Sequence, residues 1–178
     1  MKPQATKFFQ FLEKRENRQV PLKIKFLNPK DFKLTPEDLN VERNLNLSNT
    51  QIKSLPNNVT VDGYLNLSNT QIKSLPDNLK IKGDLTLRNT PIESLPNNLE
   101  VGGDLNLNNT QIKSLPNNLK VGENLWLNYT PITSLPDNLK VEWALWLQNT
   151  PLAEKYTREQ IRSIIEEKGG YVKTFIRI

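Results

Sequence analysis

Few side chains in this sequence are suited to catalysis or to metal binding. The chain contains no Cys and no His, which excludes a histidine-based triad, a thiol nucleophile, a disulfide framework and a zinc site built from the usual ligands. The remaining candidates for acid–base chemistry are paired carboxylates such as Asp84 and Asp104. On an open polar sheet these carboxylates would simply be solvated. We therefore predict that the protein is not an enzyme and has no metal or cofactor.

The aromatic side chains offer a different kind of site. All 3 Trp residues lie close together in the sequence, with one Tyr among them at a position that is Asn in the corresponding segments: Trp126, Tyr129, Trp143 and Trp146. Exposed indole rings are costly unless a partner covers them, and Trp and Tyr dominate the hot spots of protein interfaces. We predict partner contacts at these four residues, with Arg88 and Tyr64 as secondary contacts. The alternative is that the C-terminal residues fold over Trp126 and Trp146.

A repeat of twenty residues positions these side chains. A Leu-x-Leu unit recurs at this interval, followed each time by Thr, by Ile or Leu and, in most copies, by Ser-Leu-Pro. The Leu-x-Leu units begin at Leu45, Leu65, Leu85, Leu105, Leu125 and Leu145. Alternation directs both leucines inward and the residue between them outward, as in a short strand. The outward columns contain positions 44, 46 and 48 and their images, so Trp126 and Trp146 should lie about 5 Å apart in adjacent turns.

One repeat cannot fold by itself. About six apolar side chains per unit stabilise it by roughly 9–18 kcal/mol, whereas ordering the backbone of the unit costs about 20–40 kcal/mol. Stacked units share a core and strand hydrogen bonds, which predicts a solenoid. The Pro residue excludes a helix from the return segment. We also expect the recurring Thr hydroxyls, such as that of Thr90, to form an internal ladder.

The repeat resembles a known family. The segment Leu105-Asn-Leu107-Asn-Asn-Thr110-Gln-Ile112 is similar to the leucine-rich repeat core L-x-L-x-x-N-x-L, with Thr in place of the usual Asn or Cys. The Leu-Pro unit resembles the short repeats of bacterial effectors and, more closely, repeats of bacteriophage and bacterial proteins. This resemblance implies a mainly β leucine-rich repeat arc of short parallel strands, with few convex helices, that binds macromolecules on its concave face. A parallel β-helix is the alternative, with a second strand around Val61, Ile81 and Val101.

The two ends are expected to cap the solenoid. Residues 1–31 form the expected N-terminal cap, with a helix over 6–17 and a strand over 22–26 as a degenerate first turn. Residues 32–152 hold the repeats, and residues 153–178 form the C-terminal cap. There, Thr157 and Gln160 form a capping box, Gly169 and Gly170 end the helix, and residues 171–178 form a single final strand.

Charge is concentrated at the N-terminal end. Residues 1–34 contain nine Lys or Arg and three Asp or Glu, whereas residues 35–150 contain nine and twelve. The net charge of +5 therefore describes one end of the chain and not a continuous basic groove. No apolar run reaches the length of a membrane span, and Lys and Gln interrupt the start where a signal peptide needs an apolar stretch. We expect a cytoplasmic location, in a bacterium or in a phage-infected host cell.

Three functions fit these observations. The first is a non-enzymatic protein-binding module, a phage or bacterial protein that binds and blocks a host protein through its concave face. The second is a nucleic-acid-binding protein that uses its basic N-terminal end. The third is a carbohydrate-binding or structural solenoid, in which stacked Trp rings would hold sugars. The first is our prediction. The partner is expected to be a protein, with nucleic acid as an alternative and no contact with a membrane.

Overall fold

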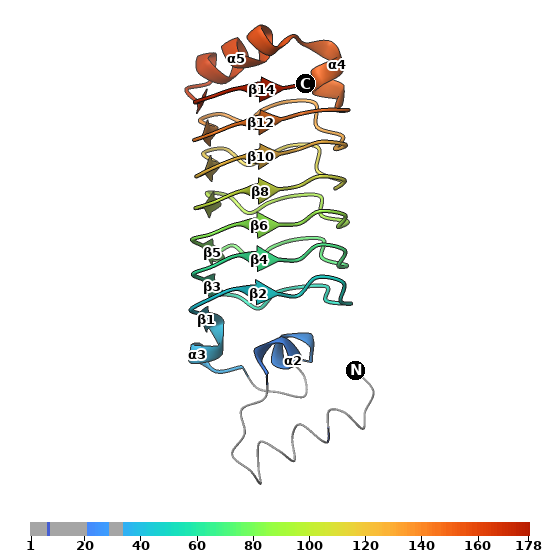
Figure 1. The fold of residues 1–178 in the computed structure, drawn as a ribbon, viewed down its shortest axis with the longest axis vertical. Coiled ribbons are helices and arrows are strands. Elements are labelled where there is room, and N and C mark those ends of the chain that lie inside the picture. Colours follow the sequence, from blue (N-terminus) through green and yellow to red (C-terminus); the bar gives the residue numbers. More distant parts are fainter. Residues whose placement is uncertain (1–6, 8–20, 29–33) are drawn as a thin grey trace.

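The structure is a computed structural model that describes residues 7, 21–28 and 34–178. It is a parallel β-solenoid in which the chain winds through stacked turns, each contributing two short strands (Figure 1). The odd-numbered strands form one seven-stranded parallel sheet, in the order β1-β3-β5-β7-β9-β11-β13. The even-numbered strands form a second one, in the order β14-β12-β10-β8-β6-β4-β2. We call them the odd-strand sheet and the even-strand sheet.

All of these strands are two residues long. Strands β1, β3, β5, β7, β9, β11 and β13 comprise Asn40–Val41, Thr60–Val61, Lys80–Ile81, Glu100–Val101, Lys120–Val121, Lys140–Val141 and Tyr171–Val172. Strands β2, β4, β6, β8, β10, β12 and β14 comprise Leu45–Asn46, Leu65–Asn66, Leu85–Thr86, Leu105–Asn106, Leu125–Trp126, Leu145–Trp146 and Ile176–Arg177.

The prediction of a mainly β repeat solenoid is confirmed. The second strand per turn, which the sequence places around Val61, Ile81 and Val101 in the parallel β-helix alternative, is present. The return segments 51–56, 71–76, 91–96, 111–116 and 131–136 contain neither helix nor strand. The corresponding segment of the last repeat is different, because it begins the cap with the helix α4, Pro151–Lys155. The turns stack into an upright column (Figure 1). The outward columns at positions 44, 46 and 48 and their images, where the sequence predicts binding, lie on the outer face of the even-strand sheet.

Neighbouring turns keep a fixed register of twenty residues. Leu65 pairs with Leu85 and Asn66 with Thr86, and equivalent pairs recur along both sheets. The backbone N–H of Leu65 donates to the carbonyl of Asp84 at 2.8 Å, which bonds each turn to the next. The recurring leucines therefore lie over one another, in one continuous buried core.

The expected ladder of Thr hydroxyls is wrong. The Oγ1 of Thr90 donates to the carbonyl of Leu87 at 2.6 Å, inside its own turn. The equivalent Thr residues of all the remaining repeats donate the same hydrogen bond within their own turns, at 2.6–2.8 Å. This hydroxyl closes the bend after the strand, because the carbonyl it reaches would otherwise be buried without a donor. The turns are instead joined by Asn side chains.

An Asn ladder runs along the bend that follows the even-numbered strands. The side-chain amide of Asn69 donates to Asn49 at 3.0 Å, Asn89 donates to Asn69 at 2.8 Å, and Asn109 donates to Asn89 at 3.1 Å. All of these residues have a positive φ, which Asn tolerates better than most residues. One side chain thus supplies both the bend and the contact between turns.

Two glycines allow the odd-strand sheet to pack closely. A Cβ added to Gly102 would lie 1.9 Å from the carbonyl oxygen of Lys82, and one added to Gly122 would lie 1.9 Å from the carbonyl oxygen of Gly102. Any side chain at these positions would push neighbouring backbones apart. The equivalent positions 62, 82 and 142 carry side chains, so this close approach is local to the turns of Gly102 and Gly122.

The N-terminal end corrects one prediction. The segment expected to be a strand over 22–26 is the helix α2, Leu22–Leu27, followed by the short helix α3, Pro36–Leu39. Phe26 of α2 is buried in the core, and Lys25 pairs with Asp38 at 2.9 Å. A further strand would leave the core open at its own outer edge, whereas a helix lying across the end covers it. The helix expected over 6–17 lies, apart from Lys7, outside the described residues.

The C-terminal cap contains the predicted helix and ends in one more solenoid turn. Helix α4 comprises Pro151–Lys155 and helix α5 comprises Arg158–Glu167, whose first turn carries the predicted capping box between Thr157 and Gln160. The single final strand predicted over 171–178 is instead two strands, β13 and β14, which pair with β11 and β12 in different sheets because the chain bends between them as in the earlier turns. In the described part of the chain, no helix is long and apolar enough to cross a membrane.

The substitution Thr90→Val tests the role of the Thr hydroxyl. It removes the donor to the Leu87 carbonyl and leaves that carbonyl buried without a partner. We expect the free energy of unfolding to fall by about 1–2 kcal/mol, measured by urea denaturation. Thr90→Ser keeps the hydroxyl and should recover much of this loss. Equal stability of the Val variant and the wild type would contradict the assigned role.

Candidate functional site

The outer face of the even-strand sheet has the composition expected for a solvated surface over most of its length. Its side chains alternate with buried leucines, as Asn66 does between Leu65 and Leu67. Its columns are mainly small and polar, although Ala144 and Asn128 are buried. The last turns are different, because there the middle column contains Trp126 and Trp146.

These two indole rings stack on each other. Strands β10 and β12 pair Trp126 with Trp146, and the ring centroids lie 4.4 Å apart with an angle of 11° between the planes. This distance matches the strand spacing of a sheet, so the register alone brings the rings into contact. The Nε1–H of Trp126 approaches a carboxylate oxygen of Asp104 at 3.4 Å, whereas the Nε1–H of Trp146 is buried without a partner in the described structure.

The last turn adds Phe175 and Arg177 to this pair. The ring of Phe175 meets Trp146 edge to face, with centroids 5.7 Å apart. The guanidinium of Arg177 lies 5.9 Å from the Trp146 ring centroid and 5.0 Å from that of Phe175, within the range of cation–π attraction. We call Trp126, Trp146, Phe175 and Arg177 the aromatic cluster.

The C-terminal cap contributes Phe175 and Arg177 to the aromatic cluster and leaves the cluster partly exposed. Trp126 and Trp146 are each half-buried, and Phe175 is 41% exposed. Strand β14 lies beside the Trp pair in the same sheet, and helix α5 contacts β13 and β14. The sequence analysis did not identify Phe175 and Arg177 as site residues. The sequence does contain a pattern that indicates a further turn here, since Val172 to Ile178 has the same spacing of apolar residues as Val141 to Leu147.

Two further predicted residues lie beside the aromatic cluster. Trp143 and Tyr129 are both 60% exposed. Trp143 precedes β12, and Tyr129 lies three residues after Trp126, so each is displaced from a stacked Trp by roughly 10 Å along the strand direction. At this distance, a large partner can contact these two rings together with the aromatic cluster, whereas one small ligand cannot.

Tyr129 has an unfavourable backbone conformation. Its φ is 59°, at a position where the turns before and after have Asn at 55°. A bulky residue in this left-handed region is strained, and the Tyr also interrupts the ladder of Asn side chains after Asn109. The local structure gives no reason for an exposed aromatic ring here, which makes Tyr129 a candidate for contact with a partner.

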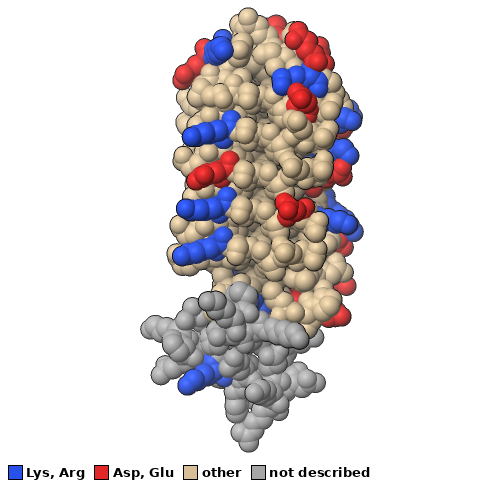
Figure 2. All heavy atoms as spheres, turned by 180° about the vertical axis from the view of Figure 1, so that it is seen from behind, with Lys and Arg blue, Asp and Glu red and all other residues tan. Residues whose placement is uncertain are grey.

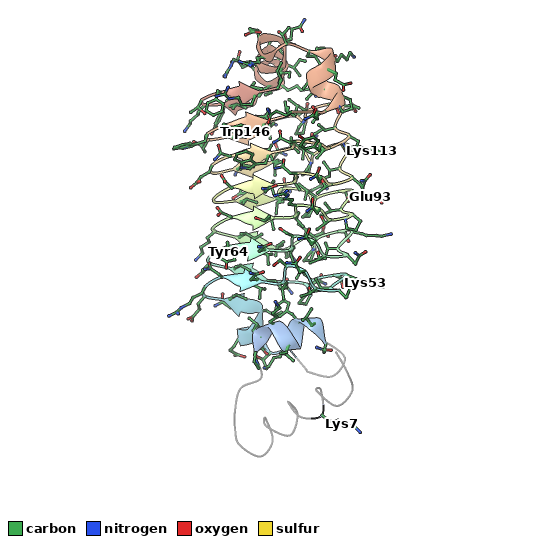
Figure 3. The ribbon with its side chains drawn as sticks, turned by 45° about the vertical axis from the view of Figure 1, so that its right-hand side comes forward. Lys7, Lys53, Tyr64, Glu93, Lys113 and Trp146 are labelled. Atoms are coloured by element: carbon green, nitrogen blue, oxygen red, sulfur yellow. The ribbon has the colours of Figure 1, made fainter. Side chains whose placement is uncertain are left out.

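The secondary candidates lie farther away. Tyr64 is 39% exposed and lies on the same side as Trp146, toward the N-terminal turns (Figure 3). It is separated from the turn of Trp126 by three turns, which is about 14 Å. Arg88 is exposed in the third column of the sheet face. The structure does not bring either residue into the aromatic cluster.

The paired carboxylates have a structural role. Asp84 accepts the backbone N–H of Asp104 at 2.9 Å, and Asp104 accepts the backbone N–H of Asn124 at 2.8 Å. Asn44 accepts the N–H of Tyr64 in the same way. These side chains are thus occupied in joining one turn to the next. Within the described ranges, no group of three or more acidic residues could hold a metal ion.

The charged flank along one side of the column has mixed sign. Lys53, Lys73 and Lys113 line up along the stack with Glu93 between the last two, and all four are exposed. Figure 2 shows this row along one edge, with an acidic side chain between basic ones, and Figure 3 labels three of its members. The alternation lowers the field that the row would exert on an anionic partner.

A shallow groove of about 310 Å³ lies on the odd-strand sheet, beside Gly102 and Gly122. Of its charged groups, Lys120 pairs with Glu100, and Glu142 accepts hydrogen bonds from Tyr171 and Lys173. Hydrogen bonds from Lys173 and Tyr171 lower the pKa of the Glu142 carboxyl, and the same carboxylate raises the pKa values of Tyr171 and Lys173. These groups neutralise each other at the surface, and nothing in their arrangement points to a ligand.

Comparisons of the chain with protein-family models, with curated proteins and with solved structures found no match. The candidate site therefore rests on the geometry of the aromatic cluster.

The substitution Tyr129→Asn separates stability from binding at this position. It should relieve the backbone strain and restore the Asn ladder, raising the free energy of unfolding by about 1 kcal/mol. Tyr129→Ala removes the same ring but keeps the unfavourable conformation, so it should not stabilise the protein. Urea denaturation of both variants measures the difference. An Asn variant less stable than the wild type would show that the Tyr ring supports the fold.

Proposed function

We propose that this protein is a non-enzymatic binding module that recognises another protein through the aromatic cluster at the C-terminal end of the even-strand sheet. The observation that carries the proposal is the stack of Trp126 and Trp146, extended by Phe175 and left partly exposed on an otherwise small and polar face. Clustered aromatic and Arg side chains are the groups that contribute most binding energy at protein interfaces.

The ring geometry favours a protein over a carbohydrate. A sugar binds by stacking on an exposed ring face. Here one face of Trp126 and one face of Trp146 are covered by each other, and the edge-on ring of Phe175 lies against Trp146 as well. The exposed surface of the aromatic cluster therefore consists largely of ring edges, with the guanidinium of Arg177 beside them. Such a surface suits the irregular apolar and polar contacts of a protein partner.

The charges disfavour a nucleic-acid partner. Asp84 and Asp104 lie on the same sheet face as the aromatic cluster, and Glu93 interrupts the lysine row on the flank. Among the described residues of the N-terminal end, the ammonium group of Lys25 is paired with Asp38 and largely buried. Binding to a phosphate backbone needs several free cations along one surface.

The resemblance of the repeat to leucine-rich repeats of bacteriophage and bacterial proteins extends the proposal. On this basis the partner is a bacterial host protein in the cytoplasm, and binding inhibits it by covering its working surface. Trp143 and Tyr129, both exposed at the margins of the aromatic cluster, would add contacts to such a large partner.

A pull-down from bacterial lysate tests the proposal. The wild type is compared with the double variant Trp126→Ala/Trp146→Ala, with and without nuclease, and captured proteins are identified by mass spectrometry. We expect a protein that is captured only by the wild type and is insensitive to nuclease, because loss of a central aromatic anchor costs about 2 kcal/mol or more of binding energy.

The matched control is Asn46→Ala/Asn66→Ala, which alters the same column in the first turns. It should capture the partner as the wild type does, and far-UV circular dichroism should show that both double variants are folded. Retention of every partner by the Trp double variant would reject the proposed site. Loss of all partners after nuclease treatment would favour the nucleic-acid alternative.

A further inference from the structure

A bend joins each odd-numbered strand to the even-numbered strand that follows it, and these bends stack along the column (Figure 1). We call the stacked positions 42–44 and their images in later turns the corner. The middle position of the corner is glycine in three consecutive turns: Gly63, Gly83 and Gly103. In the next two turns the same position carries Glu123 and Trp143. Trp143 is 60% exposed, so its ring projects into solvent at the end of a stretch that has no side chain in this position.

Three carboxylates occupy the corner in the consecutive turns just before Trp143: Asp84, Asp104 and Glu123. The contacts between turns hold them in line. The N–H of Asp104 donates to a carboxylate oxygen of Asp84 at 2.9 Å, and the N–H of Trp143 donates to the carbonyl of Glu123 at 3.1 Å. The stretch from Asp84 to Trp143 covers three turn spacings, which is about 14 Å.

These carboxylates present their charge to solvent. Backbone N–H groups donate to one oxygen of Asp84 and to one oxygen of Asp104, which joins the turns but supplies no positive charge. Asp84 and Glu123 are exposed, and Asp104 is half-buried. None of the three forms a salt bridge with a Lys or Arg in the described part of the chain.

The lysines beside the corner are engaged with other carboxylates. Their salt bridges join Lys82 to Asp62, Lys120 to Glu100 and Lys173 to Glu142. Hydrogen bonds from Lys173 and Tyr171 lower the pKa of the Glu142 carboxyl, and the nearby charge of Lys140 lowers it as well. Lys140 therefore lies close to Glu142. These ammonium groups leave the three carboxylates of the corner without a cation.

The arginines of this region lie at a distance from the three carboxylates or contact other groups. Arg177 lies over the aromatic rings of the last turns. Arg88 follows Asp84 by four residues, which is roughly 13 Å along the strand direction, and Arg43 lies two turns before Asp84, which is about 10 Å along the column. The corner from Asp84 to Glu123 thus has a local excess of negative charge, which attracts a cationic partner.

The ring of Trp143 adds a second attraction for a cation. A guanidinium is planar and stacks on an indole face, where the ring quadrupole attracts its charge. The cation–π contacts among the described residues do not involve Trp143. Since Glu123 lies one turn before Trp143, about 5 Å away, one guanidinium can stack on the ring and pair with this carboxylate at the same time.

We propose that the partner engages the corner with a basic segment of polypeptide. One Arg of this segment stacks on Trp143 and pairs with Glu123, and further basic side chains meet Asp104 and Asp84. In an extended segment, basic residues at i, i+2 and i+4 span about 13 Å, which matches the length of the corner to be covered. The inference rests on the proposed function, because it names the chemistry of the partner beside the aromatic cluster.

The probe is the peptide acetyl-Arg-Ser-Arg-Ser-Arg-amide, titrated into the full isotopically labelled chain and followed by NMR. We expect shifts of the Glu123 amide and of the Trp143 indole N–H signal, which is assigned by its loss in Trp143→Phe. The indole signals of Trp126 and Trp146 should shift less. The same peptide with citrulline, an uncharged analogue of Arg, should bind about tenfold more weakly, because it lacks the charges that the corner attracts.

Variants of the protein test the two attractions separately. Asp84→Asn/Glu123→Gln removes two charges and keeps the contact between turns, because Asn44 accepts the equivalent N–H at 3.0 Å. It should weaken binding of the Arg peptide about fivefold, and Trp143→Ala should weaken it about threefold. The matched control Asp77→Asn/Glu93→Gln removes two exposed carboxylates elsewhere on the column and should leave the affinity unaltered.

Three outcomes would overturn the proposal. The first is equal binding of the Arg and citrulline peptides, and the second is an affinity that neither Trp143→Ala nor Asp84→Asn/Glu123→Gln changes. The third is a dimer of the protein alone, seen by sedimentation and dissociated by Asp84→Asn/Glu123→Gln, because the occupant would then be a second copy. In the pull-down, capture that depends on Trp126 and Trp146 but not on Trp143 or Glu123 would reject the basic segment and leave the proposed function intact.

Discussion

The register between turns is the constraint on which the rest of the structure depends. Each two-residue strand is too short to be stable alone, and within the repeats it is held by hydrogen bonds to the equivalent strands twenty residues away on either side. Once this register is set, like residues lie over like residues. The buried leucines form one core, the Asn side chains form a ladder, and Trp126 stacks on Trp146 at the spacing of the sheet.

The C-terminal turn shows how a site can arise from a change in that register. Between β12 and β14 the offset is 31 residues, because α4 and α5 are inserted before the last turn. The insertion buries Ile161 and Ile165 over the end of the core. It also sets Phe175 and Arg177 beside the Trp pair, and it places Arg162 where its guanidinium donates to the carbonyls of Val172 and Thr174 in the last turn. Cap and candidate site are thus products of the same segment.

Much of this architecture can be predicted from the sequence, since a repeat fixes both the period and the inward face. Leu-x-Leu predicts the even-numbered strands, and Thr157 with Gln160 predicts the start of α5. Alternation at Leu22, Ile24 and Phe26 is misleading, because the same segment also suits a short helix that buries Phe26 and packs Leu22 and Leu27 against the core. The Thr hydroxyl binds inside its turn, which spacing between repeats cannot reveal. Phe175 and Arg177 lie outside the twenty-residue period, because 31 residues separate the last two turns, and only the apolar spacing that Val172 to Ile178 shares with Val141 to Leu147 indicates their place beside Trp146.

The central claim is that the aromatic end of the even-strand sheet is a surface for a protein partner. Hydrogen–deuterium exchange of the full chain, free and bound to its captured partner, tests this most directly. The account predicts slower exchange at backbone amides in the turns of β10, β12 and β14, with unchanged exchange in the turns of β2, β4 and β6. Protection confined to the first turns or to the lysine flank, with the aromatic turns unaffected, would contradict it.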